Sequence, residues 1–165
     1  MILEAYGAAY KFEVIMLRPA NVFGLGHFWS GSSGGQKMQR LIEAGLDGAT
    51  ARIPSAETMA NEYIYAKDVG RAVDAATTAK RPPQIHFNIG NGYVSSFDEV
   101  LAAVKALCPN VRYEVEAGES PHSKTAPLDI SAAKQHLSWE PRFTLQSAFE
   151  DYLKDLKAAR AVAKS

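Results

Sequence analysis

Short apolar runs alternate with stretches of helical spacing along this chain, and that alternation constrains the fold more than any other feature. The run from Val14 to Leu17 is short and continuous, which is typical of a parallel strand covered on both faces. Two further strands are expected at Glu62–Ala66 and Ile85–Ile89, and a helical pattern follows each of the three. This order of strands and helices predicts a fold of the α/β class.

The remaining elements follow from spacing and from turn residues. Met1–Lys11 reads as the last turns of a helix with apolar residues almost all round, so it is expected to be buried or paired. Complete helices are expected at Gln36–Leu46, Val69–Ala79, Phe97–Leu107, Ser131–Leu137 and Leu145–Arg160. A fourth strand is expected at Val111–Val115, and loops at Gly24–Gly35, Arg52–Asn61 and Gly118–Pro127.

Several polar or aromatic residues are assigned to structure rather than to a site. Asp68 is expected to cap the helix that follows it, because a carboxylate there accepts from free backbone amides. Ser96–Glu99 has the spacing of a capping box, and Thr144 is expected to cap the last helix. Asp129 is assigned to a further cap and Trp139 to the core.

Charge and hydropathy exclude several classes of function. The 165 residues carry 18 Lys+Arg and 18 Asp+Glu, which gives a formal net charge of zero. Nucleic acids and anionic membranes are bound through a basic surface, so neither partner is expected. No apolar run reaches spanning length, and residues 1–12 lack the basic start and the cleavage site of a secretory signal. These features predict a cytoplasmic protein.

Cysteine and histidine give no indication of a metal site. Cys108 is the single cysteine, which excludes an intrachain disulfide, and its helical spacing from apolar residues predicts a packed thiol. The four histidines show no metal-ligand spacing with one another or with Cys108, and His86 is expected to be a structural residue of its strand. No metal ligand is therefore predicted.

Three groups of residues, in order along the chain, resemble the motifs of one family. Leu17–Gly24 reads Leu-Arg-Pro-Ala-Asn-Val-Phe-Gly, close to the family's Leu-Arg-Pro-x-Asn-Val-Tyr-Gly. Glu62–Val69 resembles Asp-Phe-Ile-Tyr-Val-x-Asp-Val, and Asn88–Gly92 resembles Asn-Ile-Gly-x-Gly. Asp129–Lys134 and Leu137–Pro141 resemble the closing Asp-x-Ser-Lys-Ala and Leu-Gly-Trp-x-Pro. Together they resemble the extended short-chain dehydrogenases, the NAD-dependent epimerase/dehydratase family.

The resemblance implies which part of such an enzyme this chain corresponds to. In the family, a nucleotide-binding Rossmann half and a catalytic Tyr-x-x-x-Lys precede the segment that resembles Leu17–Gly24. It therefore implies a partial doubly wound α/β fold, the C-terminal substrate-binding lobe of an extended short-chain dehydrogenase. Residues 1–165 would form a single domain, with 1–24 as the last helix turns and strand of the Rossmann part and 25–165 mainly the substrate-binding lobe.

The family's cofactor-binding and catalytic motifs are not found in the sequence. No Gly-x-x-Gly-x-x-Gly follows an apolar strand, and Gly31–Gly35 is interpreted as a loop near the substrate. Tyr6 and Lys11 imitate the Tyr-x-x-x-Lys pair, but their spacing is one residue too long. The family's lysine would fall about twenty residues before Arg18, upstream of Met1. No catalytic residue is therefore predicted, and NAD(P), which the family implies, is not expected to bind this chain alone.

The resemblance also implies ligand contacts where the first strand ends. Pro19 lacks an amide proton and holds the preceding residue extended, which sets the direction of the exit from the strand. In an intact enzyme Pro19 and Ala20 would lie near the nicotinamide, and the Asn21 amide would donate to the substrate. The alternative is that Asn21 only stabilises its own turn.

Two positions differ from the pattern of nucleotide-sugar epimerases. An arginine that binds the diphosphate commonly precedes the Asp-Tyr-Ile pattern of those enzymes, and Asn61 stands at that position here. Another arginine commonly lies before the closing motif, whereas residues 118–124 contain none. Asparagine does not supply the charge with which arginine binds phosphate. A sugar, a sugar acid or another small carbonyl or hydroxyl compound therefore competes with a nucleotide sugar as the expected substrate.

Further candidates for substrate contact lie in a loop and at the start of a helix. His122 lies in the polar loop before the closing motif. The helix after the glycine-rich loop begins with three polar residues that could contact an anionic substrate, or form a solvated face instead: Gln36, Lys37 and Arg40.

Two functions from different classes remain open. In the first, the chain supplies the substrate lobe of an NAD(P)-dependent epimerase, dehydratase or dehydrogenase, in which a tyrosinate removes a hydroxyl proton while hydride passes to NAD. It would act only with the nucleotide-binding half provided upstream or by another chain. In the second, it is a stand-alone, non-catalytic binding domain or a truncated gene product. The bare faces and edges of Val14–Leu17 predict association with the missing half or with further copies of the chain.

Overall fold

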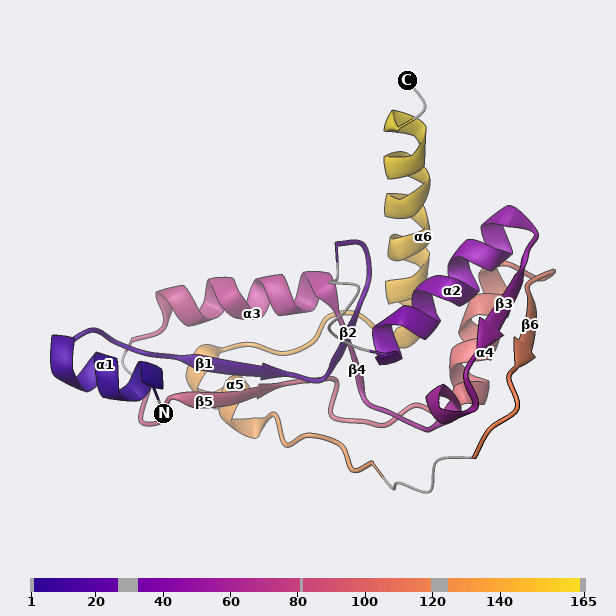
Figure 1. Ribbon diagram of the computed structural model, residues 1–165. Helices are drawn as coiled ribbons and strands as arrows, with labels where there is room; N and C mark the ends of the chain where they lie inside the picture. Colours follow the sequence, from indigo (N-terminus) through magenta and orange to yellow (C-terminus); the bar gives the residue numbers. More distant parts are fainter. Residues whose placement is uncertain (1, 27–32, 81, 120–124, 164–165) are drawn as a thin grey trace.

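The computed structural model describes residues 2–26, 33–80, 82–119 and 125–163, which form an elongated mixed α/β structure (Figure 1). Its helices are α1 (Ile2–Tyr10), α2 (Ser33–Asp47), α3 (Ala66–Thr78), α4 (Phe97–Leu107), α5 (Ser131–Leu137) and α6 (Leu145–Val162). Its strands are β1 (Met16–Pro19), β2 (Asn21–Phe23), β3 (Thr50–Ile53), β4 (Tyr63–Tyr65), β5 (His86–Ile89) and β6 (Arg112–Val115), and a 3₁₀ helix, η1, spans Ser55–Thr58. No helix within the described ranges has the length and apolar character needed to cross a membrane.

The strands form parallel pairs: β1 with β5, β2 with β4, and β3 with β6. Only Ala20 separates β1 from β2, and its amide donates to the Ile89 carbonyl at 2.9 Å. The next amide, that of Asn21, donates to the Glu62 carbonyl at 3.2 Å. The chain therefore changes its partner strand within a single residue, directly after Pro19.

Two hydrophobic cores lie side by side along the long axis of the molecule. The larger core belongs to what we call the α2 end, formed by α2, β3, β6, α4 and α6, and it buries Leu41, Val104 and Phe149. The smaller core belongs to the α1 end, formed by α1, β1, β5, α3 and α5, and it buries Phe87 and Trp139. Figure 1 shows α3 lying along β1 and β5, with α2 and α4 at the opposite end.

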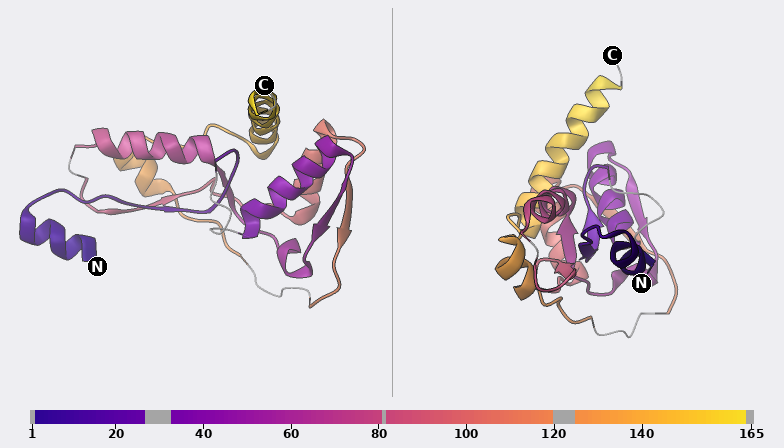
Figure 2. Two further views of the ribbon diagram at one scale, coloured as in Figure 1. Left: turned by 45° about the horizontal axis from the view of Figure 1, so that its top comes forward. Right: turned by 90° about the vertical axis from the view of Figure 1, so that its left-hand side faces the viewer.

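Helix α1 is hardly covered by the rest of the chain. Gly7 is its only buried residue, whereas Ile2 is 77% and Tyr10 is 71% exposed. Figure 2 shows the helix at the far end of the molecule, and His86 of β5 joins it through Glu4, with 3.0 Å between His86 Nε2 and Glu4 Oε1. The helix is thus not buried within this chain, and its pairing with another element stays a prediction.

The helix ends predicted from capping residues are largely confirmed. The Ser96 hydroxyl accepts from the Glu99 amide at 3.2 Å, and the Glu99 carboxylate accepts from the Ser96 amide at 2.7 Å, which completes a capping box. Thr144 caps α6, and the Asp129 carboxylate accepts from the first amide of α5 at 2.9 Å. These contacts fix the start of three helices.

The core residues predicted from the sequence are confirmed as well. Trp139 is buried, and its indole N–H donates to the Asp68 carbonyl at 3.1 Å, which satisfies its polar atom inside the core. Cys108 is buried too, and burial raises the pKa of its thiol. The thiol is therefore a packing group.

Asp68 is not the helix cap that the sequence predicts. α3 begins earlier, at Ala66, so Asp68 lies inside its first turn. Its fully buried carboxylate accepts instead from the amides of Arg142 at 3.0 Å and Phe143 at 3.1 Å, and from the Arg71 guanidinium at 2.6 Å. The amides just before α6 need acceptors in the interior, and Asp68 supplies them. The residue thus joins α3 to the segment that leads into α6.

Two short strands differ from the sequence prediction, and a third is less buried than expected. The loop predicted from Arg52 is wrong at its start, because Arg52 and Ile53 end β3, and β2 was not predicted at all. β1 begins at Met16, and its last residues, Arg18 and Pro19, are exposed. Among the described residues β5 is the one strand that pairs with β1, so β1 is not covered on both faces, which agrees with the bare face and edge expected of it without further protein.

Candidate functional site

The residues that follow β1 form the centre of the candidate site. Pro19 is exposed at the end of the strand, and Ala20 is half-buried. The side-chain amide of Asn21 donates to the Glu62 carbonyl at 3.1 Å, which holds it at the point where the chain changes strand partner. The three residues thus lie together, and the hydrogen bond joins Asn21 to a distant segment rather than to its own turn, whereas its contact with a substrate stays a prediction.

Glycine ends this motif for a steric reason. Gly24 has a φ of +123°, a conformation that side chains disfavour. A Cβ atom there would lie 2.6 Å from the Tyr65 ring, so any larger residue would displace the ring. The close approach allows β2 to end directly above the core of the α2 end.

The amino-terminal turn of α2 packs directly against Asn21. α2 begins at Ser33, earlier than predicted, and its buried residue Gly34 has so little space that a Cβ would come within 3.1 Å of the Asn21 side chain. Asn21 and the start of α2 therefore form one continuous surface, although they come from segments separated in the sequence.

A buried carboxylate that sequence reasoning missed organises the segments around Asn21. Glu62 is 2% exposed, and its side chain accepts from the amides of Gly92 at 2.7 Å and Leu128 at 2.5 Å. Asn91 reaches the same strand by donating to the Tyr63 carbonyl at 2.7 Å. The acidic first position of the Glu62–Val69 motif was the available signal, because a charged residue next to an apolar strand is buried only when it is bonded.

Lys37 does not lie on a solvated helix face. It is fully buried, and its ammonium donates to the carbonyls of Glu57, through a short bond, and of Met59 at 3.3 Å. The ammonium also lies 5.3 Å from the centre of the Tyr63 ring and 5.6 Å from that of Phe97. Burial lowers its pKa to about 8, and the Glu57 carboxylate opposes that shift. The solvated alternative is therefore wrong for Lys37.

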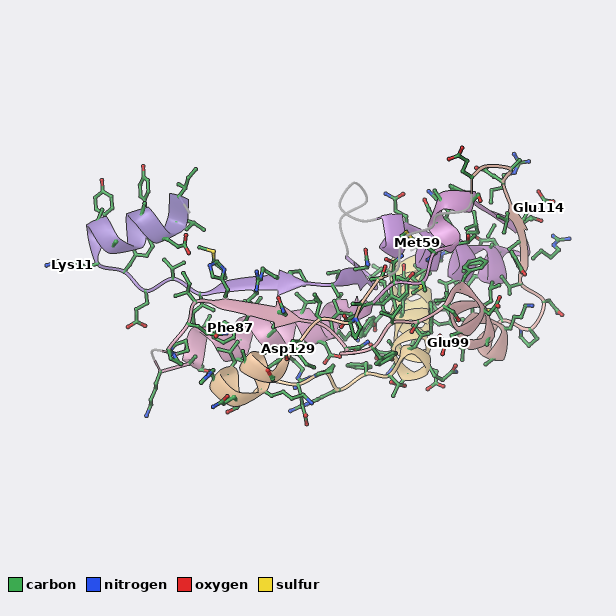
Figure 3. All side chains as sticks on the ribbon, turned by 90° about the horizontal axis from the view of Figure 1, so that it is seen from below. Lys11, Met59, Phe87, Glu99, Glu114 and Asp129 are labelled. Carbon is green, nitrogen blue, oxygen red and sulfur yellow. The ribbon has the colours of Figure 1, made fainter. Side chains whose placement is uncertain are left out.

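The neighbouring candidates converge on the same loop. Arg40 forms an ion pair with the Glu57 carboxylate at 2.9 Å and donates to the Gln36 side chain at 3.1 Å. The Asn61 amide donates to the Met59 carbonyl at 3.4 Å, the acceptor that Lys37 also uses. Figure 3 places Met59 at the α2 end of the molecule. The structure thus gathers Gln36, Lys37, Arg40 and Asn61 around residues 55–61, whereas His122 lies outside the described residues.

A polar groove of about 530 Å³ is lined mainly by α2 and β3. Arg40, Glu43 and Asp47 line it from α2, and Arg52 lines it from β3. Asp47 is already paired with Arg160 of α6 at 2.5 Å. With Glu116 the groove combines two arginines with three carboxylates, which suits a small polar ligand that carries hydroxyls.

The pair that imitates the family's Tyr-x-x-x-Lys lies away from the groove. Tyr6 and Lys11 belong to the α1 end, where Tyr6 stacks on Tyr10 at 5.5 Å between ring centres. Figure 3 shows Lys11 far from Met59, so this pair does not reach the groove. Within the described part of the chain, no group of His, Cys, Asp and Glu side chains is arranged to hold a metal ion.

The sequence of this chain is similar to those of one family of enzymes. The model of the NAD dependent epimerase/dehydratase family matches residues 1–90. A dTDP-6-deoxy-L-talose 4-dehydrogenase (NAD(P)(+)) from Kitasatospora kifunensis is 26% identical over 153 residues, which cover 87% of this chain and 46% of that protein. The chain therefore spans about half the length of this relative.

Solved structures show a similar fold. An epimerase from Methanothermobacter thermautotrophicus superposes with a TM-score of 0.79 at 16% identity, over 99% of this chain and 49% of that one. The UDP-glucose 4-epimerase of Thermotoga maritima, solved with UDP-glucose, gives 0.74 at 22% identity, over 96% and 50%. The UDP-glucuronic acid 4-epimerase of Bacillus cereus, a Y149F mutant in complex with a UDP-sugar and NAD, gives 0.74 at 22% identity, over 94% and 49%.

Proposed function

Because this chain belongs to the NAD dependent epimerase/dehydratase family, we propose that it forms the substrate-binding side of an NAD(P)-dependent enzyme that acts on a sugar or a nucleotide sugar. The observation that carries the proposal is the convergence of Asn21, the start of α2 and the loop 55–61. Arg40, which is paired with Glu57 of that loop, also lines the groove and links the two. Polar groups held by buried contacts are what a site needs to orient a polyhydroxyl ligand.

The cofactor and the catalytic pair would come from a nucleotide-binding part outside residues 1–165. When bound, NAD(P) takes up hydride from a sugar carbon and can return it. The exposed Pro19 and the half-buried Ala20 would form part of the wall beside the nicotinamide, without an amide donor at residue 19. Asn21, held by the Glu62 carbonyl, would present its side chain to the substrate.

The α1 end is the proposed contact with that nucleotide-binding part. Apolar side chains of α1 are exposed, and β1 pairs with β5 on one edge only among the described strands. An uncovered apolar helix beside an open strand edge is unfavourable in water and is stabilised when further protein covers it. Residues 1–24 would then belong to the nucleotide-binding part, and 25–165 mainly to the substrate lobe.

The substrate class depends on Asn61. Its side chain bonds within its own loop and carries no charge, so it offers a diphosphate less than an arginine would. Two cations lie at that loop: the Lys37 ammonium is buried against the Glu57 and Met59 carbonyls, and the Glu57 carboxylate already neutralises part of the charge of Arg40. We therefore favour a sugar acid or another small sugar over a nucleotide sugar as the ligand of this groove.

Calorimetric titration with glucuronic acid, UDP-glucuronic acid and UDP tests the proposal. Glucuronic acid is expected to bind the purified chain, and Arg40→Gln is expected to weaken it about tenfold by removing one charge-assisted contact. Asn61→Arg is expected to strengthen UDP binding by a similar factor, whereas the matched control Asn110→Arg, on an exposed turn, should not. Absence of binding by all three ligands would contradict a substrate-binding role.

A stand-alone binding domain is the second candidate, and the α2 end favours it. That end closes a core of its own, with Leu41, Val104 and Phe149 fully or almost fully buried. A domain of this kind would bind its ligand with no dependence on further protein. Binding of glucuronic acid that is unchanged by Asn21→Ala and Ala20→Glu, which alter the proposed junction with the nucleotide-binding part, would favour this candidate.

A further inference from the structure

Strand β6 leaves one of its edges open at the outside of the α2 end. Its four residues are all exposed, and β3 is its only strand partner among the described residues. Figure 1 shows β6 beyond β3, at the end of the molecule opposite α1, and Figure 3 shows Glu114 there. An open edge of this kind is a template for pairing with another strand.

The open edge presents the backbone groups of alternate residues. The Glu116 amide donates to the Ile53 carbonyl at 2.9 Å, so residues of the same parity, Arg112 and Glu114, direct their backbone groups toward β3. Tyr113 and Val115 therefore direct theirs toward the open side. The Val111 amide is already bonded to the Cys108 carbonyl at 3.0 Å, which leaves its carbonyl as the group for a partner strand.

The sequence of this edge is complementary to itself in the antiparallel direction. Residues 111–115 read Val-Arg-Tyr-Glu-Val, with an arginine and a glutamate at equal distances from a central tyrosine. We propose that β6 pairs with β6 of a second copy of this chain around a two-fold axis at Tyr113. Arg112 then lies opposite the partner's Glu114, and Val115 opposite the partner's Val111.

The charges on the exposed face agree with this arrangement. Arg52 is the register partner of Glu114 across β3 and β6. In the dimer, one row across the sheet therefore reads Arg52, Glu114 and the partner's Arg112, with charges that alternate in sign. Opposite charges on adjacent strands stabilise a sheet, whereas like charges destabilise it. Arg112 also donates to the Gly48 carbonyl, and its guanidinium has further donors for a carboxylate.

The opposite face of the edge supplies apolar surface. Tyr113 packs against Phe97 at 5.9 Å between ring centres and remains 37% exposed, and Val115 is 47% exposed. Pairing around Tyr113 brings both side chains next to their equivalents in the second copy. Strand edges that stay exposed to solvent commonly carry charges of a single sign or a proline, which prevent pairing. Apolar residues alternating with a complementary charge pair instead favour a second copy as the occupant.

Charge reversal with sedimentation equilibrium tests the pairing. Arg112→Glu and Glu114→Arg each place like charges opposite one another twice in the dimer, and each is expected to weaken dimerisation about tenfold. The double variant Arg112→Glu/Glu114→Arg restores opposite charges between the two copies. The like charge that it places beside Arg52 is the same in the monomer and the dimer, so the dimer is expected to recover. Leu3→Glu, on α1, is the control for association through the other end. A dimer unaffected by the single reversals, a double variant without recovery, or a chain that stays monomeric at 100 micromolar overturns the proposal.

Disulfide trapping tests the register independently of charge. Residues 112 and 114 of the two copies form non-hydrogen-bonded pairs, whose Cα atoms lie about 4.5 Å apart, within the range that a disulfide spans. An oxidised mixture of Arg112→Cys and Glu114→Cys chains should therefore cross-link, whereas either variant alone should not. Cross-linking of the single variants to the same extent as the mixture would contradict the proposed register.

Discussion

The two ends of this molecule differ in how completely helices cover their strands and bury their apolar side chains. At the α2 end, helices cover β3 on its inner face and Phe149 is fully buried. At the α1 end, α3 and α5 cover one side of β1 and β5, whereas α1 leaves most of its apolar residues exposed. This difference is the basis of our proposal that the α2 end packs by itself, whereas the α1 end contacts further protein.

Truncation of one aromatic side chain at each end should give the largest difference in unfolding free energy between the two ends. Phe149→Ala creates a cavity in the closed core and is expected to lower the free energy of unfolding by about 4 kcal/mol. Tyr10→Ala removes an exposed ring and is expected to change it by less than about 0.5 kcal/mol. Urea unfolding followed by circular dichroism measures both. Equal losses would break the distinction between a closed and an open end.

Asp68 should be the strongest polar link between the two ends. Asp68→Ala leaves the buried amides of Arg142 and Phe143 without their acceptor and is expected to cost about 3 kcal/mol in unfolding free energy. Asp68→Asn retains an acceptor oxygen and should lose less. Urea unfolding of both variants checks the order, and equal stability of Asp68→Ala and the wild type would show that the segment before α6 finds other partners.

The buried ammonium of Lys37, at the α2 end, should make the free energy of unfolding depend on pH. Because the folded pKa of about 8 lies below the unfolded value of 10.5, the unfolded chain binds more protons between these values, and stability rises with pH there. From pH 7.5 to 9.5 the expected gain from this group is about 2 kcal/mol. Unfolding of the wild type and of Lys37→Met at both pH values measures it. An equal rise in the variant would assign the effect to other groups.

Removal of a helix cap should give the smallest loss of unfolding free energy, and the loss should be confined to one helix. Ser96→Ala removes the hydroxyl that accepts from the Glu99 amide and is expected to cost about 1 kcal/mol. Hydrogen exchange should accelerate in the first turn of α4, with little change at the α1 end. Equal acceleration at both ends of the molecule would contradict the local effect.

Helices and caps were more predictable from the sequence than strands. A capping box such as Ser96–Glu99 depends on residues three positions apart, so local spacing contains the information. β3 has four residues and gains its identity from pairing with β6, far away in the sequence. Asp68 was misassigned for the same reason, since the amides that donate to its carboxylate, those of Arg142 and Phe143, lie more than seventy residues further along.

The sequence named candidate residues, whereas their contacts came from the structure. The motif around Asn21 and the polar start of α2 are local signals, and the structure brings the two together, whereas their contact with a ligand stays a prediction. Burial of Lys37 depends on carbonyls from η1 and on the ring of Tyr63, and neither can be inferred from spacing along one helix. Glu62 likewise became visible only through the amides it binds.

Titration of the purified chain with NADH tests the central claim most directly, with energy transfer from tryptophan to bound NADH as the signal. If the substrate side alone is present in residues 1–165, no saturable transfer is expected up to millimolar NADH. Saturable binding would contradict that account, because it would mean that these residues assemble a cofactor site without a nucleotide-binding part.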